Sequence, residues 1–315
     1  MQRKNYIADH SAELTGQIQY IEKYLPDSSI NPAYPSRLLP YGQMPKGLYL
    51  LGNFPDASRK AVAIVGARAC SAYGKAEARR FASVLASSGV QIISGMASGI
   101  DAWAQKGALE VQGRTFSVLG CGVNVCYPRE NYGLYREILE GHGGIISEFL
   151  PDSEPLAWHF PIRNRIISAL ADLILVVEAR KKSGSLITAD YALEQGKTVF
   201  AVPGRNEDAL SQGCNHLIEQ GAGIATSPEM LLEELGISVS GKPKEQPAEK
   251  TLPAAWKQSE DFKNVYACLR GEALSLSELL EHSGMNTARL SQVLMQLCLS
   301  GYVEEIAPGV YRRTW

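Results

Sequence analysis

Short apolar runs that alternate with helical stretches constrain the fold of this chain most strongly. From Ala61 onwards, each run is rich in Val and Ile and lacks the apolar–polar alternation of a half-exposed strand. Strands of this kind are typical of a parallel sheet that helices cover on both faces. The sequence therefore predicts an α/β fold with a parallel-sheet core. The predicted strands are residues 61–65, 90–93, 115–119, 144–146, 173–177, 198–202 and 222–225.

Small or polar residues follow nearly every one of these runs. In an open parallel sheet, the carboxyl ends of the strands lie on one edge, and ligands bind outside that edge. We therefore expect one shared rim that carries glycines, hydroxyl groups and arginines. The residues that follow the strands are Gly66, Ser94-Gly95, Gly120, Ser147-Glu148, Glu178 and Pro203-Gly204.

The chain divides into four parts by composition. Residues 1–45 are poorly periodic and proline-rich, and we expect a short lead-in with a helix over residues 18–25. Residues 46–237 form the core, and residues 238–255 have the Pro, Lys and Glu content of a linker. Residues 256–315 predict three helices (262–269, 276–282 and 287–299) and a hairpin over 302–311, the order of a small winged-helix-like domain.

Bulk composition excludes several classes of protein. The net charge of −2 means that any nucleic-acid site must be local, because a non-specific polyanion binder is usually basic. The six cysteines form no C-x-x-C pair and the histidines have no ligand spacing, so we expect reduced thiols and no metal. The chain has neither a signal-peptide pattern nor a run of 18 apolar residues. We therefore expect a cytoplasmic protein without a membrane partner.

The first strand-to-helix turn begins like a dinucleotide site but lacks its fingerprint. No G-x-G-x-x-G spacing follows the strand, and the second strand ends in Ser94-Gly95 instead of an acidic residue. One interpretation is a helix N-terminus at Gly66 that receives a phosphate, with Arg68 beside it. The other is a tight turn with a solvated Arg68. In the second turn, Ser98 is predicted to cap a helix, with Asp101 three residues later.

The segment 158–165 is the most informative for function. Arg163, Asn164 and Arg165 follow a predicted helix start, where a cation opposes the helix dipole unless an anion is bound. Phe160 lies just before them, and aromatic rings next to basic residues supply the stacking and phosphate contacts of single-strand binding. The alternative is that Trp158 and Phe160 are core residues and that Arg165 forms an ion pair with Glu148 or Glu178.

A third turn combines basic residues with hydroxyl groups. Lys182, Ser183, Gly184 and Ser185 follow a strong strand and open a helix. Their amides and hydroxyls can hold a phosphate, although the spacing is not that of a Walker loop. A solvated charged turn is the alternative.

Taken together, these stretches resemble the DNA-processing protein DprA/Smf family over about residues 31–236. The resemblance includes Val65-Gly-Ala-Arg68, Ser94-Gly-Met-Ala-Ser-Gly-Ile-Asp101 and Phe160-Pro-Ile-Arg-Asn-Arg-Ile-Ile167. It continues through Ser183-Gly-Ser-Leu-Ile-Thr188 and Val199-Phe-Ala-Val-Pro-Gly204.

The resemblance implies a Rossmann-like core that binds single-stranded DNA and delivers it to the RecA recombinase in natural transformation. It implies a non-enzymatic homodimer without a cofactor, whose interface includes Asn215, Ile218 and Ile224. It also implies that the helical domain of many relatives is truncated here to the lead-in. With the turns described above, the expected DNA-binding residues are Gly66, Arg68, Ser94, Gly95, Phe160, Arg163, Asn164, Arg165, Lys182, Ser183, Gly184 and Ser185.

Two further features qualify this expectation. Relatives often carry a lysine shortly before the Arg-Asn-Arg motif, where this chain has Ala157, Trp158 and His159. The C-terminal part has six basic and seven acidic residues, so we expect it to contact protein rather than duplex DNA.

An alternative class, a nucleotide-processing enzyme of the phosphoribohydrolase type, requires a carboxylate in a closed pocket. Glu148, Glu178 and Asp190 are its candidates.

Overall fold

The computed structural model describes residues 17–141, 143–237, 256, 259–269 and 273–313. The chain forms two compact units, Met1–Val239 and Ser240–Trp315. The predicted linker over 238–255 and the first 16 residues of the predicted lead-in lie outside the described residues.

A nine-stranded sheet runs through the described part of the first unit, in the order β1-β2-β6-β5-β4-β3-β7-β8-β9. The seven strands from β6 to β9 in this order are parallel, whereas β1 and β2 are antiparallel at one edge. The bounds are β1 Gln19–Glu22, β2 Gly47–Gly52, β3 Ala61–Val65, β4 Gln91–Ser94, β5 Thr115–Val118, β6 Gly144–Ser147, β7 Leu173–Val176, β8 Thr198–Ala201 and β9 Gly223–Ile224.

The prediction of a helix over residues 18–25 is wrong. This segment contains β1, which pairs with β2 so that Tyr20 lies opposite Tyr49. Their ring centroids are 4.6 Å apart, an aromatic cross-strand contact that stabilises a strand pair. Since β2 itself pairs with β6, tertiary pairing decides the conformation of this segment. All seven predicted core strands are present.

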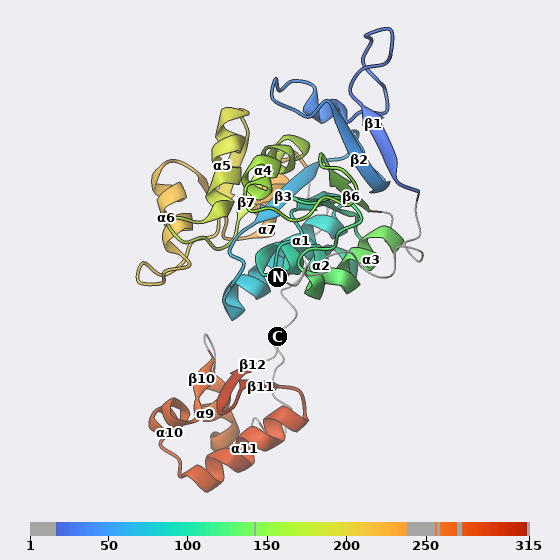
Figure 1. Ribbon diagram of the computed structural model, residues 1–315. Coiled ribbons are helices and arrows are strands. Elements are labelled where there is room, and N and C mark those ends of the chain that lie inside the picture. Colours follow the sequence, from blue (N-terminus) through green and yellow to red (C-terminus); the bar gives the residue numbers. More distant parts are fainter. Residues whose placement is uncertain (1–16, 142, 238–255, 257–258, 270–272, 314–315) are drawn as a thin grey trace, which may run out of the picture. The chain divides into compact units, whose positions relative to one another are not determined.

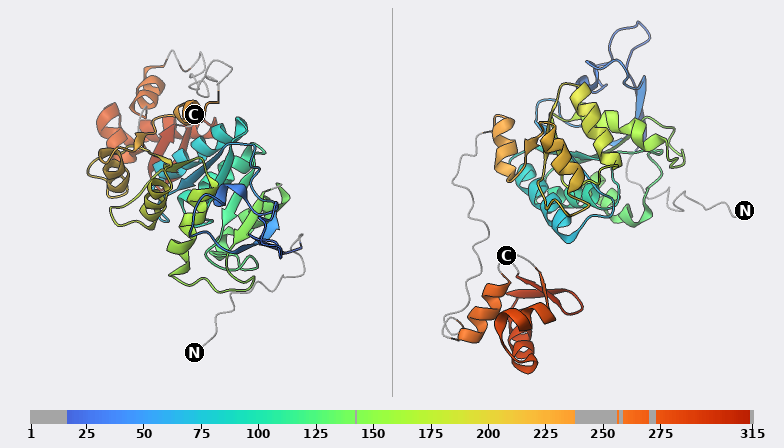
Figure 2. Two further views of the ribbon diagram at one scale, coloured as in Figure 1. Left: turned by 90° about the horizontal axis from the view of Figure 1, so that it is seen from above. Right: turned by 90° about the vertical axis from the view of Figure 1, so that its left-hand side faces the viewer.

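Helices cover both faces of the sheet, as the unalternating strands require (Figure 1). In β3, Ala63 and Val65 contribute to the core on one face, and Val62 and Ile64 contribute to the core on the other. The first face carries α4 (His159–Leu170), α5 (Gly184–Glu194) and α6 (Gln212–Glu219). The opposite face carries α1 (Ala72–Ser87), α2 (Ile100–Glu110), α3 (Tyr132–Glu140) and α7 (Pro228–Glu234), and Figure 2 shows the two layers from two further directions.

The strand order reverses between β3 and β7. The strands β4, β5 and β6 extend the sheet on one side of β3, while β7, β8 and β9 extend it on the other side. The connections that leave β3 and β7 therefore diverge at their carboxyl ends, where an open α/β sheet leaves a crevice. Short 3-10 turns at Ser36–Leu38 (η1) and Arg129–Asn131 (η2) complete the first unit as described.

The second unit contains the three predicted helices and the predicted hairpin. Its elements are α9 (Glu260–Cys268), β10 (Leu274–Ser275), α10 (Leu276–Ser283), α11 (Thr287–Leu299), β11 (Val303–Ala307) and β12 (Val310–Arg313). The strands form a sheet in the order β10-β12-β11, and the helices enclose a separate apolar core. The winged-helix class of this unit stays a prediction. Within the described residues, no helix combines the length and the apolar character that a membrane crossing needs.

Candidate functional site

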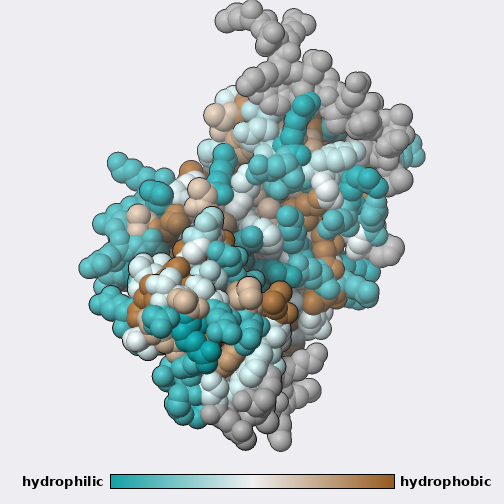
Figure 3. All heavy atoms as spheres, turned by 90° about the horizontal axis from the view of Figure 1, so that it is seen from below, coloured by the Kyte–Doolittle hydropathy of each residue, from teal (hydrophilic) through white to brown (hydrophobic). Residues whose placement is uncertain are grey.

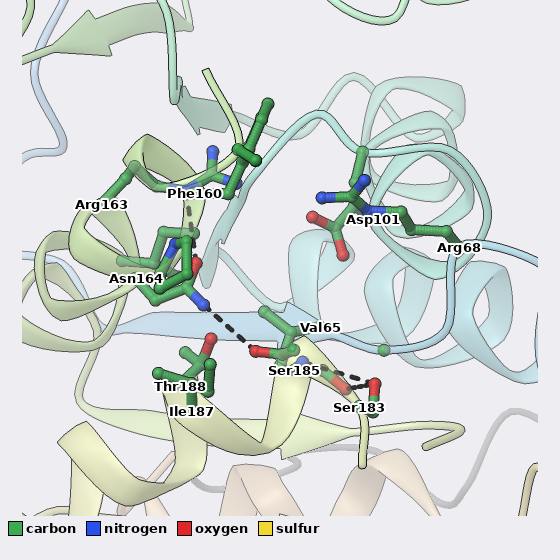
Figure 4. Close-up of a pocket in the computed structure, with 16 residues that line it drawn as sticks. Val65, Arg68, Asp101, Phe160, Arg163, Asn164, Ser183, Ser185, Ile187 and Thr188 are labelled. Carbon is green, nitrogen blue, oxygen red and sulfur yellow. Dashed lines mark hydrogen bonds between the residues drawn. The ribbon is translucent and has the colours of Figure 1, made fainter. Parts of the chain in front are cut away.

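A crevice of about 330 Å³ lies at the carboxyl ends of the central strands, where the strand order reverses. This volume is within the range of small-ligand sites. Figure 4 shows residues of α4 on one side, Arg68 and Asp101 on the other, and the start of α5 below them. The lining residues are Val65, Gly66, Arg68, Ala97, Asp101, Ala157, Phe160, Pro161, Arg163, Asn164, Ile167, Ser183, Gly184, Ser185, Ile187 and Thr188.

The N-terminal turns of three helices face this crevice. They belong to α2, α4 and α5, which contribute Asp101, Phe160 and Ser185 respectively. A helix N-terminus presents unpaired amide groups and the positive end of the helix dipole. The ends of α4 and α5 at one hollow favour an anion without requiring a high net charge, whereas at the α2 end the Asp101 carboxylate lies beside the Arg163 guanidinium group. The arrangement suits an anion such as a phosphate.

Arg68 supplies an exposed guanidinium group at the rim. It follows β3, and its guanidinium carbon lies 5.1 Å from the centroid of the Phe160 ring. This cation–π contact holds the two side chains together while leaving guanidinium N–H groups available for a ligand. No ion pair of Arg68 occurs among the described residues. The crevice therefore offers a cation and an aromatic ring side by side.

Gly66 is required by the close approach of two other segments. A Cβ atom at this position would lie 2.7 Å from Cγ1 of Ile100 and 2.9 Å from the carbonyl oxygen of Glu178. The backbone amide of Ala67 donates to that same oxygen at 2.7 Å. A side chain at residue 66 would push apart the turns that form the floor of the crevice.

Hydroxyl and amide groups line the α5 side of the crevice. Ser183 is the N-cap of α5, and its Oγ lies 2.7 Å from Oγ of Ser185. The Nδ2 of Asn164 donates to the carbonyl oxygen of Gly184 at 3.2 Å, which joins α4 to α5. Lys182 precedes this turn and is exposed, although it does not line the crevice.

Arg163 lines the crevice, but its side chain is hydrogen-bonded to the backbone that forms the crevice wall. The residue is only 4% exposed. Its Nη1 donates to the carbonyl oxygen of Gly95 at 2.9 Å and also to that of Val118. Arg163 therefore ties α4 to the ends of β4 and β5. Burial lowers the pKa of its guanidinium group to about 10, and the nearby carboxylate of Asp101 opposes that shift. Its guanidinium group is committed to internal partners, so we revise its expected role from phosphate contact to support.

Asp101 is the buried counterpart of Arg163. Burial raises the pKa of its carboxyl group, while Arg163 and the amide of Gly95 act in the opposite direction. The Gly95 amide donates to Oδ2 at 3.0 Å. A Cβ atom at Gly95 would lie 2.7 Å from Nη2 of Arg163 and 2.8 Å from Oδ2 of Asp101. Gly95 is thus held between these two side chains and does not line the crevice.

Ser94 is fully buried, and its Oγ donates to the carbonyl oxygen of Ile64 at 2.7 Å. Its hydroxyl group therefore joins β4 to β3 and does not line the crevice.

The prediction that Ser98 caps α2 is wrong as well. The N-cap is Gly99, whose φ is +77°, and Ser98 donates to the carboxylate of Glu130. A Cβ at Gly99 would lie 2.3 Å from the carbonyl oxygens of Ala67 and Arg68, so only glycine fits there.

Arg165 lies outside the crevice. Its two terminal nitrogens each approach one carboxylate oxygen of Glu148 at 2.7 Å, and its Nε donates to the carbonyl oxygen of Gln43. Both side chains are largely buried. The alternative of an Arg165–Glu148 pair is thus what the structure contains. The pair joins the end of β6 to α4, and the bond to Gln43 joins the N-terminal segment to α4.

The three carboxylates named for an enzyme do not reach the crevice. Glu148 pairs with Arg165, and Glu178 is buried, accepting hydrogen bonds from the backbone amide and Oγ of Ser71 at the start of α1. Asp190 is exposed on α5 and does not line the crevice. Among the described residues, no three His, Cys, Asp or Glu side chains are grouped so that they could hold a metal ion.

The residues expected at a dimer interface lie at the end of the first unit. Asn215 is partly buried, and its side chain bonds to both backbone groups of Gly204. Ile218 packs against the core, whereas Ile224 is 46% exposed on β9, the last strand of the sheet. Their role in self-association stays a prediction.

Some lining residues were not expected from the sequence. Asp101 was interpreted as a helix-capping residue, but its spacing of six residues from Gly95 lets its carboxylate fold back onto that amide. Ala97, Ile187 and Thr188 are small or apolar and give no signal by residue type. Seven expected residues do line the crevice together with Arg163: Gly66, Arg68, Phe160, Asn164, Ser183, Gly184 and Ser185.

Fold and crevice together define a Rossmann-like α/β protein whose ligand site lacks the glycine pattern of a dinucleotide site. The chain belongs to the family described as DNA recombination-mediator protein A, which matches residues 28–236. It is 39% identical over 280 residues to Protein Smf of Escherichia coli K12, covering 89% of this chain and 75% of that protein. The predicted DprA/Smf family and the Rossmann-like class of the core are thereby confirmed.

Two solved structures support the assignment. The X-ray structure of DNA processing protein A from Streptococcus pneumoniae matches with a TM-score of 0.63 at 37% identity, covering 71% of this chain and 76% of that one. A structure of DNA processing protein A from Helicobacter pylori matches with a TM-score of 0.59 at 30% identity, covering 70% and 96%. The latter work concerns the single-stranded DNA binding mode of the Helicobacter pylori protein.

Proposed function

We propose that the crevice binds the backbone of single-stranded DNA. The observation that carries this proposal is the convergence of three helix N-termini beside the exposed Arg68 guanidinium and the Phe160 ring. Amides and a guanidinium group recognise phosphate regardless of sequence, and an aromatic ring stacks on any base. The Helicobacter pylori relative, whose single-stranded DNA binding has been studied, adds support from within the family.

Within this proposal, the residues divide by role. Arg68, with Lys182 beside the crevice, supplies positive charge, and Ser183, Gly184 and Ser185 supply amide and hydroxyl groups at the start of α5. Phe160 contacts a base or a sugar. Gly66, Ser94, Gly95, Asn164, Arg163 and Arg165 support the crevice through the internal contacts described above.

The wider role that follows is a recombination mediator without catalytic activity. In it, the protein protects incoming single strands in the cytoplasm and loads RecA onto them during natural transformation. Self-association through the region of Asn215, Ile218 and Ile224 is part of the same proposal, because exposed Ile224 lies on the terminal strand. None of the three carboxylates named for the enzymatic alternative lines the crevice. Turnover of a nucleoside monophosphate would restore it.

The C-terminal unit has a different electrostatic character. The basic side chain of α11, Arg289, pairs with Asp261 at 2.7 Å. Arg312 pairs with Glu304, and Arg313 lies over the ring of Tyr266. These cations are engaged within the unit, so we propose that it contacts protein rather than the major groove of a duplex.

A titration with matched single-stranded and duplex oligonucleotides at two salt concentrations tests the proposal. We expect tighter binding of the single strand, weakened by salt, because phosphate contacts release counterions. Changing Arg68→Ala should lower affinity about tenfold in low salt and reduce the slope of log affinity against log salt by about 0.7, one phosphate contact.

Arg289→Ala is the matched control, since it removes one arginine from the C-terminal unit. It should leave both affinity and slope unchanged. Equal binding by the wild type and by Arg68→Ala would show that the crevice is not the DNA site. Preference for the duplex would contradict the proposed function itself.

A further inference from the structure

Trp158 is an exposed tryptophan that lies in the sequence between residues that line the crevice. It is the N-cap residue of α4, and 58% of its surface is accessible. Its neighbours in sequence, Ala157 and Phe160, line the crevice. On the face of the molecule shown in Figure 3, hydrophobic residues lie in small patches between hydrophilic ones. An exposed aromatic side chain next to phosphate-binding groups provides a surface on which a base can stack.

The indole is held by a supporting pair of rings. His159 is buried and stacks on Phe149 with centroids 3.7 Å apart, and its Nδ1 lies 3.1 Å from the carbonyl oxygen of Gly120. Trp158 meets these rings nearly at right angles, at 4.1 Å from His159 and 6.3 Å from Phe149. No parallel ring covers the indole among the described residues, yet its orientation is restrained. Because the ring is already restrained, little side-chain entropy is lost when a flat ligand stacks on its open face.

The two other tryptophans that the structure describes have partners of a different kind. Lys75 and Lys106 place their ammonium groups 3.8 and 4.7 Å from the ring centroid of Trp103. Trp256 stacks on Phe262 with an interplanar angle of 17°. Trp158 has neither kind of cover in the described residues, so it is the indole available to a ligand.

We propose that Trp158 is a stacking platform for a base of the DNA strand bound in the crevice. This inference rests on the proposed function. The occupant is a nucleobase because the crevice beside it offers phosphate-binding groups, and in a single strand the bases lie beside the phosphates they are linked to. Leu156, two residues before Trp158, is another exposed apolar side chain of the same connection, 43% accessible. Trp158 thereby extends the site beyond Phe160.

The test compares Trp158→Ala, Trp158→Phe and the wild type, each as the full chain, with a thymidine oligonucleotide. Loss of one base–aromatic stack should lower the affinity of Trp158→Ala about tenfold, and Trp158→Phe should restore most of it because it retains a ring. The salt slope should stay unchanged, because no phosphate contact is removed. Leu150→Ala is the matched control, since it removes a 66% exposed apolar side chain from the same connection and should have no effect.

An oligonucleotide with abasic positions separates stacking from other effects. On this probe, the wild type and Trp158→Ala should bind equally. If Trp158→Ala binds thymidine DNA as tightly as the wild type, or loses the same factor on abasic DNA, Trp158 is not a stacking platform, although the proposed function stands. If the wild type does not bind single strands at all, both the proposed function and this inference are wrong.

Discussion

The inner wall and the outer rim of the crevice use their charged residues differently. On the inner wall, Arg163 and Asp101 are buried and bonded to the backbone at Gly95. On the outer rim, Arg68 is exposed and rests on Phe160. An arginine next to a ligand site can thus be part of the frame or part of the binding surface, and burial distinguishes the two. The inner wall should therefore determine stability, and the outer rim should determine affinity.

The largest expected effect of breaking this division is at Arg163. Changing Arg163→Met leaves the carboxylate of Asp101 buried without its cation and frees the carbonyl groups of Gly95 and Val118. Removal of one partner from a buried charged network costs about 3–5 kcal/mol. Urea unfolding should show this loss, whereas Arg68→Met should change stability by less than about 0.5 kcal/mol. Equal stability of the two variants would abolish the distinction.

The glycines give a second comparison of wall and rim. Gly66→Ala should destabilise the protein by roughly 1–3 kcal/mol, because the new methyl group meets Ile100 and the backbone of Glu178. At Gly184, by contrast, no atom of the described residues lies within 4 Å of the place that a methyl group would take, so Gly184→Ala should be neutral or slightly stabilising. Both variants can be measured by thermal unfolding. A larger loss at residue 184 than at residue 66 would reverse the comparison.

Lys197 sharpens the comparison by placing a partly buried cation at the other end of α4. Its Nζ donates to the carbonyl oxygens of Ala169 and Ala171, and burial lowers its pKa to about 8. The folded protein releases this proton near pH 8, whereas the unfolded chain holds it until about pH 10.4. Unfolding therefore takes up a proton in this window, and the contribution of Lys197 to stability rises with pH.

We expect that rise to be roughly 1 kcal/mol, less than the full shift implies because the side chain keeps some contact with water. Unfolding of the wild type and of Lys197→Met between pH 7.5 and 10 isolates the contribution, since other groups titrate in both proteins. The difference in stability between wild type and variant should move in favour of the wild type as pH rises. A constant difference would show that Lys197 has an ordinary pKa.

The parallel core could be predicted because strands that are buried on both faces consist of continuous apolar runs, and such runs are visible in the sequence. The strands β1 and β2 could not, since their pairing depends on β6, about a hundred residues further along the chain. A short amphipathic segment such as Gln19–Glu22 carries both helix-like and strand-like patterns, and its partner decides.

The same physical reason limits prediction of the site. Strand-to-helix turns placed Gly66, Phe160 and Ser183 correctly at one crevice, because parallel strands bring their carboxyl ends together. Arg163 and Arg165, however, look alike in sequence and lie on different sides of α4. Their partners, Gly95 and Glu148, are distant in sequence, so only the folded arrangement shows that both guanidinium groups are occupied.

Photochemical cross-linking tests the central claim most directly. A single-stranded oligonucleotide that carries 5-iododeoxyuridine would be bound to the full chain, irradiated, and the adducts located by mass spectrometry. Binding in the crevice predicts adducts in the peptides that contain Phe160 and Trp158, lost when unlabelled single strand competes. Adducts confined to residues 256–315, or insensitive to competitor, would contradict it.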